Sequence, residues 1–154
     1  MATTARPWTP LEERIGSVVV KVMSALNVVA YRMTGGRIGG TFLHGAPVCL
    51  VTVIGKKSGE PHTIPLLYLR DGNDVVVVAS KGGMSKHPVW YWNLVANPNC
   101  EVEMDGRHHS MVARRVSTEE KAALWPRLCE MYPDYAGYQA RTTRDIPVLR
   151  LSPT

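Results

Sequence analysis

The sequence is poor in cysteine, and its three cysteines form no known motif. Cys49, Cys100 and Cys129 lie far apart, are odd in number and show no Cys-x-x-Cys spacing. This distribution indicates separate thiols in a reducing compartment and argues against a disulfide framework or a zinc site. The N-terminus lacks the pattern of a secretory signal, and no uninterrupted apolar stretch reaches the roughly 18 residues of a membrane span. We therefore expect a cytoplasmic protein.

The common catalytic signatures are missing as well. The chain has no G-x-G-x-x-G fingerprint, no phosphate-binding P-loop and no G-x-S-x-G elbow. No carboxylate pair suggests an acid–base dyad, and the five histidines lack metal-ligand spacing. A hydrolase would have to be built without these motifs, whereas a redox enzyme that takes its chemistry from a bound cofactor needs none of them.

The charge balance favours an anionic partner. The chain has 154 residues, of which 45% are hydrophobic and 20% charged, as expected for one soluble globular domain. Its formal net charge is +5, which suits nucleic acid, lipid head groups, or a phosphorylated or polycarboxylate small molecule. Because no run of Lys and Arg stands out, we expect no nucleic acid partner.

The N-terminal part predicts a long amphipathic helix. Thr9, Pro10 and Glu12 form a capping box with a proline at the first helical position, and Gly35-Gly36 ends the pattern. Apolar residues follow at spacings of three and four; they are Ile15, Val18, Val19, Val22, Met23, Leu26, Val29, Ala30 and Met33. This stripe could pack on the rest of the protein. Alternatively, residues 10–34 could lie on an anionic membrane, because basic residues outnumber acidic ones there.

The remaining chain predicts an α+β domain. Strands are expected over residues 48–54, 63–70, 75–79, 99–104, 107–116 and 146–151, with the Asp105-Gly106 turn between the fourth and fifth. Helices are expected after Pro88, over residues 118–131 behind a second capping box, and around residues 133–138. Five to six short, mostly antiparallel strands favour a small closed or partly closed barrel. We divide the chain into a tail and helix, residues 1–40, and a barrel domain, residues 41–154.

Two basic, glycine-containing loops and an aromatic cluster are the candidate binding features. The first loop places Lys56, Lys57 and Ser58 between two glycines, and the second is Ala79-Ser80-Lys81-Gly82-Gly83. Glycines allow backbone N–H groups to converge on an anion, and the lysines add charge. The helix that follows begins Val89-Trp90-Tyr91-Trp92-Asn93, whose rings could stack on a planar ligand. Solvated turns and core aromatics are the alternatives, and the sequence leaves both open.

Three tyrosines form the last candidate group. Tyr132, Tyr135 and Tyr138 recur at every third residue. If the segment is helical, Tyr135 and Tyr138 can close over a pocket and donate a hydrogen bond or a proton. An amphipathic surface turn would explain the same spacing.

The combined motifs resemble the deazaflavin-dependent nitroreductase family, of the mycobacterial nitroimidazole-activating type. The resemblance extends over residues 47–151 and is carried by PVCLVTVIGKKSGEPHTIPLLYLRDG, ASKGG followed by HPVWYWNLVANP, MYPDY with a later Tyr, and RDIPVLRL. It implies a split β-barrel like that of FMN-binding flavin reductases. It also implies the 8-hydroxy-5-deazaflavin coenzyme F-420, whose phosphodiester and oligoglutamate tail form a polyanion.

The resemblance assigns residues by motif position. Lys56, Lys57 and Ser58 would hold the phosphate and tail. The strand His62, Thr63, Ile64, Pro65, Leu66 and Leu67 would line the coenzyme, largely through its backbone. Val78, Ala79, Ser80 and Lys81 would bracket the phosphate and ring, with Val89, Trp90, Tyr91, Trp92 and Asn93 at the ring side. Tyr132, Tyr135 and Tyr138 would face the substrate, with Tyr135 also near the deazaflavin and Ser80 as a second candidate donor.

Two positions depart from the family pattern. His62 stands where Arg is frequent, which makes affinity for the tail dependent on pH. Leu67-Tyr68 shifts an aromatic residue by one place, which changes the ring that meets the coenzyme.

The activity implied is hydride transfer from reduced F-420 to a quinone, an activated alkene (enone) or a nitroaromatic acceptor. The alternatives are an FMN-dependent reductase or oxidase on the same barrel, and a non-catalytic protein that binds the coenzyme or fatty acids. We expect a monomer or weak dimer, either cytoplasmic or attached to the inner face of the membrane through residues 10–34.

Overall fold

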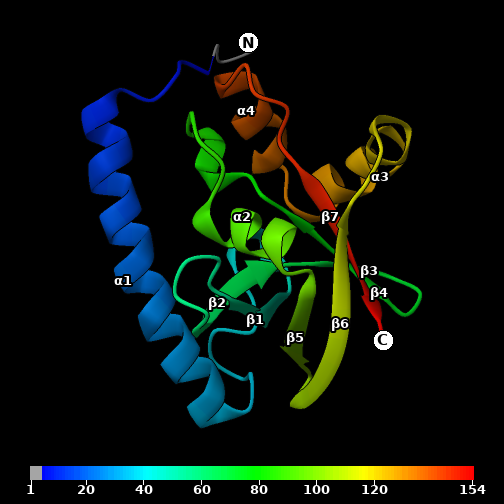
Figure 1. Cartoon of the computed structure of the whole chain (residues 1–154). Coiled ribbons are helices and arrows are strands. Elements are labelled where there is room, and N and C mark those ends of the chain that lie inside the picture. Colours follow the sequence, from blue (N-terminus) through cyan, green and yellow to red (C-terminus); the bar gives the residue numbers. More distant parts are fainter. Residues whose placement is uncertain (1–4) are drawn as a thin grey trace.

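The computed structural model describes residues 5–154 and shows an α+β fold built on one curled, antiparallel sheet (Figure 1). The strand order is β2-β1-β5-β6-β7-β4-β3. The strands are β1 (Val48–Ile54), β2 (Pro61–Leu67), β3 (Leu69–Asp71), β4 (Asp74–Val78), β5 (Asn99–Met104), β6 (Arg107–Arg115) and β7 (Val148–Pro153). The predicted split barrel is confirmed, and the predicted β1 and β5 match the observed bounds.

The strand predicted over residues 63–70 is wrong, because the chain forms two strands there. β2 pairs with β1 at one end of the sheet, whereas β3 pairs with β4 at the other end. Tyr68 lies between them, and its backbone N–H donates to the Pro47 carbonyl. The sheet therefore has seven strands instead of the expected five to six. Local alternation cannot reveal this, since a strand that changes its partner keeps the same pattern of side chains.

Two apolar clusters form the core, and β4 takes part in both. Val75 and Val77 point into the barrel with Tyr91 and Leu94 from helix α2 (Val89–Ala96). Val76 and Val78 point the other way, into a cluster formed with α3 (Thr118–Met131), α4 (Asp134–Arg141) and the segment before β7. A strand that buries both faces needs apolar residues at every position, which explains the run of four valines.

The helices are α1 (Pro10–Thr34), α2 (Val89–Ala96), α3 (Thr118–Met131) and α4 (Asp134–Arg141), with short 3₁₀ turns η1 (Leu43–Gly45) and η2 (Lys81–Gly83). The capping box of Thr9 and Glu12 is present, and Gly35 ends α1 in the left-handed region. At α3 the Ser117 hydroxyl accepts from the Glu120 N–H, but the Glu120 carboxylate pairs with Arg114. The second capping box is therefore only half formed.

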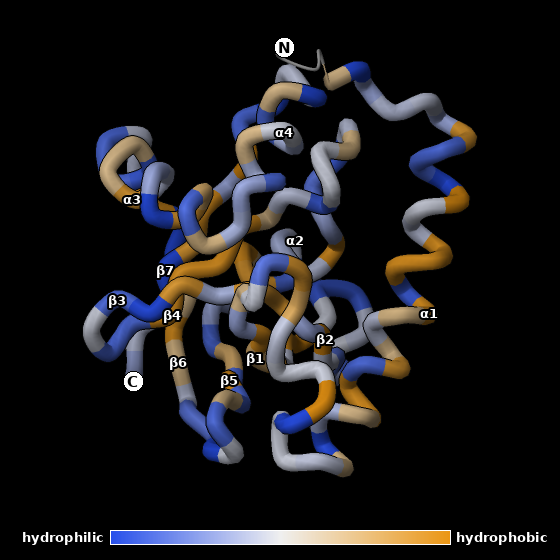
Figure 2. Tube along the Cα trace, turned by 180° about the vertical axis from the view of Figure 1, so that it is seen from behind, coloured by the Kyte–Doolittle hydropathy of each residue, from blue (hydrophilic) through white to orange (hydrophobic). Residues whose placement is uncertain are grey.

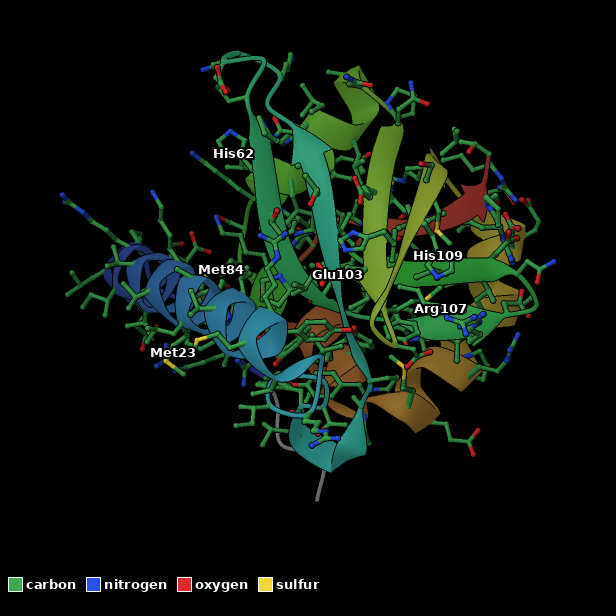
Figure 3. All side chains as sticks on the ribbon, turned by 90° about the horizontal axis from the view of Figure 1, so that it is seen from below. Met23, His62, Met84, Glu103, Arg107 and His109 are labelled. Atoms are coloured by element: carbon green, nitrogen blue, oxygen red, sulfur yellow. The ribbon has the colours of Figure 1, made fainter. Side chains whose placement is uncertain are left out.

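Helix α1 lies along one side of the barrel (Figure 1). Its apolar residues, coloured orange in Figure 2, are mostly exposed, so its apolar face is turned outward. Within α1 only Tyr31 is buried, while Met23 is exposed and projects away from the sheet in Figure 3. The inner contacts are polar: Tyr31 donates to the Glu103 carbonyl, and Arg32 pairs with the Glu103 carboxylate. The stripe of apolar residues does not pack on the barrel, which reverses the usual orientation of an amphipathic helix.

Candidate functional site

The β1–β2 turn is a tight loop tied to helix α2. The backbone N–H of Lys56 donates to Oδ1 of the buried Asn93 at 2.9 Å. Lys56, Lys57 and Ser58 are all exposed, and Ser58 Oγ lies 3.4 Å from Nε2 of His62. The two lysine side chains are thus available to an anion beside the middle of α2, where Asn93 lies.

The turn η2 lies between β4 and α2 and has an unusual backbone. Lys81, Gly82 and Gly83 have φ values of 44°, 62° and 76°, three left-handed residues in succession. At Gly83 an added Cβ would lie 2.5 Å from the Tyr138 carbonyl oxygen, so this glycine is required by space as well as by φ. The second predicted loop is therefore a shaped backbone segment packed against α4.

A basic pocket of about 510 Å³ lies next to η2. Its wall is formed by Lys81, Ser85, Lys86, His87, Val89, Trp92 and Arg144. The Trp92 side chain is 48% exposed and packs on the ring of His87. Tyr91, by contrast, is buried in the barrel and Trp90 packs against the same cluster. Of the predicted aromatic group, Trp92 is the ring that reaches the pocket.

The strand β2 is at one end of the sheet order, and two of its residues are prolines, as is common for edge strands. His62 is exposed on it, and Thr63 shares a hydrogen bond with Thr52 at 2.8 Å. An edge strand presents backbone groups on its outer side. The expectation that residues 62–67 line a ligand through the backbone is compatible with this position and stays a prediction.

The three tyrosines cluster, but largely inside the protein. Tyr132 and Tyr135 are buried, with ring centroids 4.9 Å apart, and Tyr138 is half-buried. The hydroxyls of Tyr132 and Tyr138 are 3.0 Å apart. Burial raises the pKa of both Tyr132 and Tyr135, so their hydroxyls stay protonated at neutral pH. Their proposed contact with an acceptor stays a prediction.

Sequence reasoning missed the residues that hold η2. Arg144 donates to three backbone carbonyls around it, and Glu13 of α1 accepts from the backbone N–H and hydroxyl of Ser85. Arg144 lies in the motif RDIPVLRL, but nothing in one sequence says that its side chain reaches back to residues 79–87. Such a contact becomes visible only once the chain is folded.

The site suits a planar, polyanionic cofactor. Cationic side chains gather on both sides of α2: Lys56 and Lys57 in one turn, and Lys81 and Lys86 at the pocket. Trp92 lines this pocket together with Lys81, Lys86 and Arg144, which suits a ring system with a negative tail. The donor set therefore fits a deazaflavin carrying phosphate and carboxylates.

Comparison with known proteins decides the family. A family model described as F420H(2)-dependent quinone reductase matches residues 23–153. The chain belongs to the F420H(2)-dependent quinone reductase family. This family uses coenzyme F-420, so the predicted deazaflavin cofactor and the oxidoreductase class are confirmed.

Similar proteins cover between 69% and 92% of the chain. The F420H(2)-dependent quinone reductase Rv1261c of Mycobacterium tuberculosis is 37% identical over 145 residues, which are 92% of this chain and 95% of that protein. A solved F420-H2-dependent reductase, FDR-A, is 39% identical with a TM-score of 0.65, covering 69% of this chain and 94% of that one. Another solved structure, described as a domain-swapped dimer, is 35% identical with a TM-score of 0.66, covering 84% and 100%.

Proposed function

We propose that this protein reduces a quinone with hydride from reduced coenzyme F-420, with enones and nitroaromatics as alternative acceptors. The supporting observation is the pair of cationic, glycine-containing loops that meet α2, in a chain of this family. When bound, the reduced coenzyme supplies one hydride, that is, two electrons and one hydrogen. A second proton from the protein or water completes the hydroquinone.

The protein's own residues bind and orient the reactants. Lys56, Lys57 and Ser58 hold the phosphate and tail, while Ser80 and Lys81 bracket the phosphate and ring. Holding coenzyme and acceptor together makes the transfer effectively unimolecular, which can lower the barrier by several kcal/mol.

The tyrosine cluster supplies a hydrogen-bond donor. In this proposal the Tyr135 hydroxyl, whose pKa is raised by burial, donates a hydrogen bond to the acceptor oxygen and releases a proton only as negative charge develops there. Ser80 and water are the other proton sources in this proposal.

The test is binding followed by turnover. Equilibrium dialysis should show affinity for F-420 and not for FMN. Stopped-flow mixing of reduced coenzyme, menadione and the protein should then restore the absorbance of oxidised deazaflavin at a rate proportional to protein. Binding without recovery would leave a coenzyme-storage protein, and preference for FMN would refute the proposed cofactor at this site.

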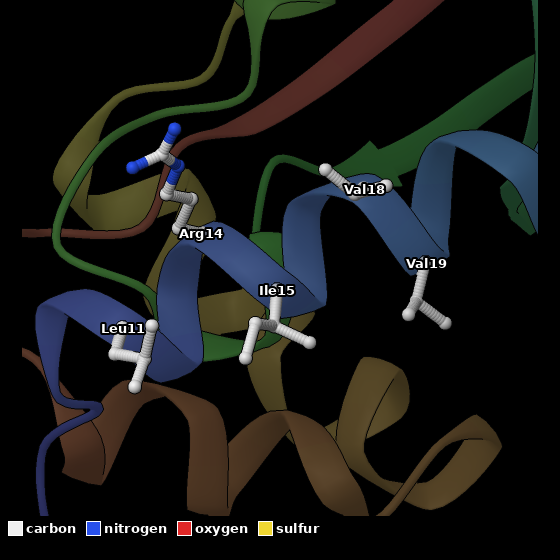
Figure 4. Close-up of a pocket in the computed structure, with 5 residues that line it drawn as sticks. All are labelled: Leu11, Arg14, Ile15, Val18 and Val19. Carbon is white, nitrogen blue, oxygen red and sulfur yellow. The ribbon is translucent and has the colours of Figure 1, made fainter.

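We further propose that the acceptor is a lipid quinone reached at the inner face of an anionic membrane, on which α1 docks. The outward face of α1 is apolar and exposed, up to 81% for Met33. Leu11, Ile15 and Val19 point the same way along a shallow groove of about 360 Å³, with Arg14 on the opposite side of the ribbon (Figure 4). An apolar face flanked by Arg and Lys is typical of interfacial helices.

Helix α1 is long and apolar enough to cross a membrane, as judged from length and composition alone. Spanning would, however, break the contacts of Glu13 with Ser85 and of Tyr31 with the Glu103 carbonyl. Those contacts favour a helix that lies on the surface of the bilayer and stays attached to the barrel.

The membrane proposal predicts a specific loss. Changing Ile15 and Val19, both exposed, to Asp should reduce sedimentation with vesicles of phosphatidylglycerol and phosphatidylcholine at least tenfold, because two charges would enter the apolar boundary. The control is Lys86→Asp, which alters charge on the pocket and not on α1. The wild-type protein could instead fail to bind vesicles and form a dimer, with the double variant remaining monomeric. In that case a second copy of the chain covers this face, and the membrane proposal is wrong.

A further inference from the structure

The segment from Ala79 to His87 connects β4 to α2; we call it the coenzyme loop. Three successive residues in it, Lys81, Gly82 and Gly83, are left-handed. A lysine at φ 44° is uncommon and persists only where surrounding contacts hold it. The coenzyme loop therefore depends on contacts from other parts of the chain.

Arg144, four residues before β7, supplies most of these contacts. Its Nε donates to the Met84 carbonyl at 2.8 Å, its Nη1 to the Ala79 carbonyl at 3.2 Å, and its Nη2 to the Ser80 carbonyl at 2.6 Å. One guanidinium thus joins the beginning and the middle of the coenzyme loop. A planar fork of donors can do this, whereas the single ammonium of lysine cannot reproduce it.

The fourth contact reaches the end of the loop. Nη1 of Arg144 lies 2.8 Å from Nδ1 of His87. Since a guanidinium can only donate, we assign Nδ1 as the acceptor and place the proton of a neutral ring on Nε2. Burial and the charges of Arg144 and Arg115 lower the pKa of His87, while Asp145 acts in the opposite direction, so the ring is neutral at physiological pH.

Helix α1 and Trp8, which lies two residues before it, hold the other side of the coenzyme loop. Trp8 Nε1 donates to the Gly82 carbonyl at 2.7 Å, and the Glu13 carboxylate accepts from the backbone N–H of Ser85 at 2.6 Å. These contacts come from α1 and the residue Trp8 before it, and within α1 only Tyr31 is buried against the barrel. Arg144 instead belongs to the segment that leads into β7 at the middle of the sheet, so it ties the loop to the rigid core.

We propose that Arg144 is a positioning residue for the coenzyme. Its guanidinium fixes the Ala79, Ser80 and Met84 carbonyls, so that the loop holds one conformation before the coenzyme arrives. This inference rests on the proposed function, because it takes Ser80 and Lys81 to be coenzyme contacts. A pre-formed loop binds without the cost of ordering it.

The experiment compares Arg144→Gln and Arg144→Lys with the wild type. For Arg144→Gln we expect amide hydrogen exchange in residues 80–87 of the coenzyme-free protein to become at least tenfold faster. The F-420 dissociation constant and the KM for reduced coenzyme should rise tenfold or more. The kcat at saturating coenzyme and the KM for menadione should change less than threefold. For Arg144→Lys the exchange rate and the F-420 dissociation constant should lie between those of the wild type and Arg144→Gln, since lysine keeps the charge and loses the planar fork of donors.

Arg150→Gln is the matched control. Arg150 is another partly buried arginine with several partners, but these are Asp71, Asp74 and Glu120, outside the coenzyme loop. Its variant should lower the unfolding midpoint and leave the F-420 dissociation constant within twofold. A general loss of stability would therefore not reproduce the pattern expected for Arg144.

Two results would overturn the proposal. If coenzyme affinity falls while exchange in residues 80–87 stays unchanged, Arg144 acts as a direct charge contact and not by positioning. If neither changes in a folded variant, the loop holds its conformation without Arg144. Should Arg144→Gln not fold, the same readouts on Arg144→Lys decide. Failure of the wild type to bind F-420 would refute the proposed function instead, and the exchange measurement would still report whether Arg144 holds the loop.

Discussion

At the residue scale, Asn93 shows how one buried polar side chain joins two parts of the site. Its Oδ1 accepts the Lys56 N–H, so the first cationic turn is anchored to α2. The sequence placed Asn93 at the ring side of the coenzyme, but the structure gives its carbonyl oxygen a structural role. A buried side-chain amide without a partner would be costly, which is why this contact is made.

Lys57 tests whether the first turn binds the coenzyme phosphate. It is exposed in the β1–β2 turn, so a substitution should leave the fold intact. Lys57→Glu is expected to raise the F-420 dissociation constant tenfold or more, because it replaces attraction by repulsion of a phosphate. Fluorescence titration of the coenzyme measures this constant.

The control for Lys57 is Arg107→Glu. Arg107 is also exposed but lies in the β5–β6 hairpin, and its reversal changes the net charge by the same amount. An equal loss of F-420 affinity in both variants would indicate a general effect of net charge. An unchanged F-420 dissociation constant for Lys57→Glu would place the phosphate elsewhere.

Tyr135 tests the proposed donor. Tyr135→Phe removes only a hydroxyl from a buried ring, and we expect kcat with menadione to fall tenfold or more while the F-420 dissociation constant changes less than threefold. Steady-state kinetics measure kcat, and fluorescence titration measures the dissociation constant. Tyr91→Phe, which removes a hydroxyl that accepts from the exposed Arg115, is the control. A parallel loss of turnover and binding would make the role of Tyr135 structural.

At the scale of elements, η2 depends on glycine for two different reasons. Gly82 and Gly83 both have positive φ, but an added Cβ at Gly82 meets nothing within 4 Å, whereas at Gly83 it meets the backbone of Tyr138. Two adjacent glycines thus separate the cost of backbone strain from the cost of a clash.

Alanine at each glycine makes this a prediction. Gly82→Ala should lower the unfolding free energy by about 1 to 2 kcal/mol, the cost of a left-handed alanine. Gly83→Ala should lower it by about 1 to 3 kcal/mol more, because η2 or α4 must move. Urea unfolding measures both, and F-420 affinity should fall more for Gly83→Ala. An equal loss of unfolding free energy in the two variants would mean that the backbone of α4 at Tyr138 can move at no measurable cost.

At the scale of the whole molecule, ion pairs join the last segment of the chain to the rest. Asp145 accepts from Lys121 at 2.6 Å and from Arg115 at 3.0 Å. The Lys121 hydrogen bond, and then the nearby charges, hold the pKa of Asp145 below its ordinary value of 3.8. The folded state therefore gains stability above that pH and loses it as the pH falls through the lowered value.

Acidification should reveal this contribution. Asp145→Asn is expected to reduce the difference in unfolding free energy between pH 7 and pH 3 by about 0.5 kcal/mol, the size typical of an exposed ion pair. Urea unfolding at the two pH values measures it. Glu130→Gln, an exposed carboxylate in α3, should leave the difference unchanged, and an equal effect of both substitutions would contradict the role of Asp145.

Much of the fold follows from local chemistry. The bounds of β1, β5 and α3 and the cap at Thr9 were predictable because strand alternation, the Asp105-Gly106 turn and capping residues act over a few neighbours. The cationic loops were visible for the same reason. The break between β2 and β3 at Tyr68 could not be predicted, since it depends on which strand each of them pairs with and not on its own residues.

The sequence by itself determined an α+β class with a small antiparallel barrel, the amphipathic N-terminal helix and the two glycine-containing cationic loops, because each depends on short-range patterns, and the family resemblance added the split form of the barrel. Only the tertiary structure decided that the apolar side of α1 faces outward and that Arg144 holds the loop before α2. Both depend on contacts between residues more than 60 positions apart, such as those of Glu13 with Ser85 and of Arg144 with Ser80. Contacts of that kind are set by how the sheet curls and not by any local preference of the chain.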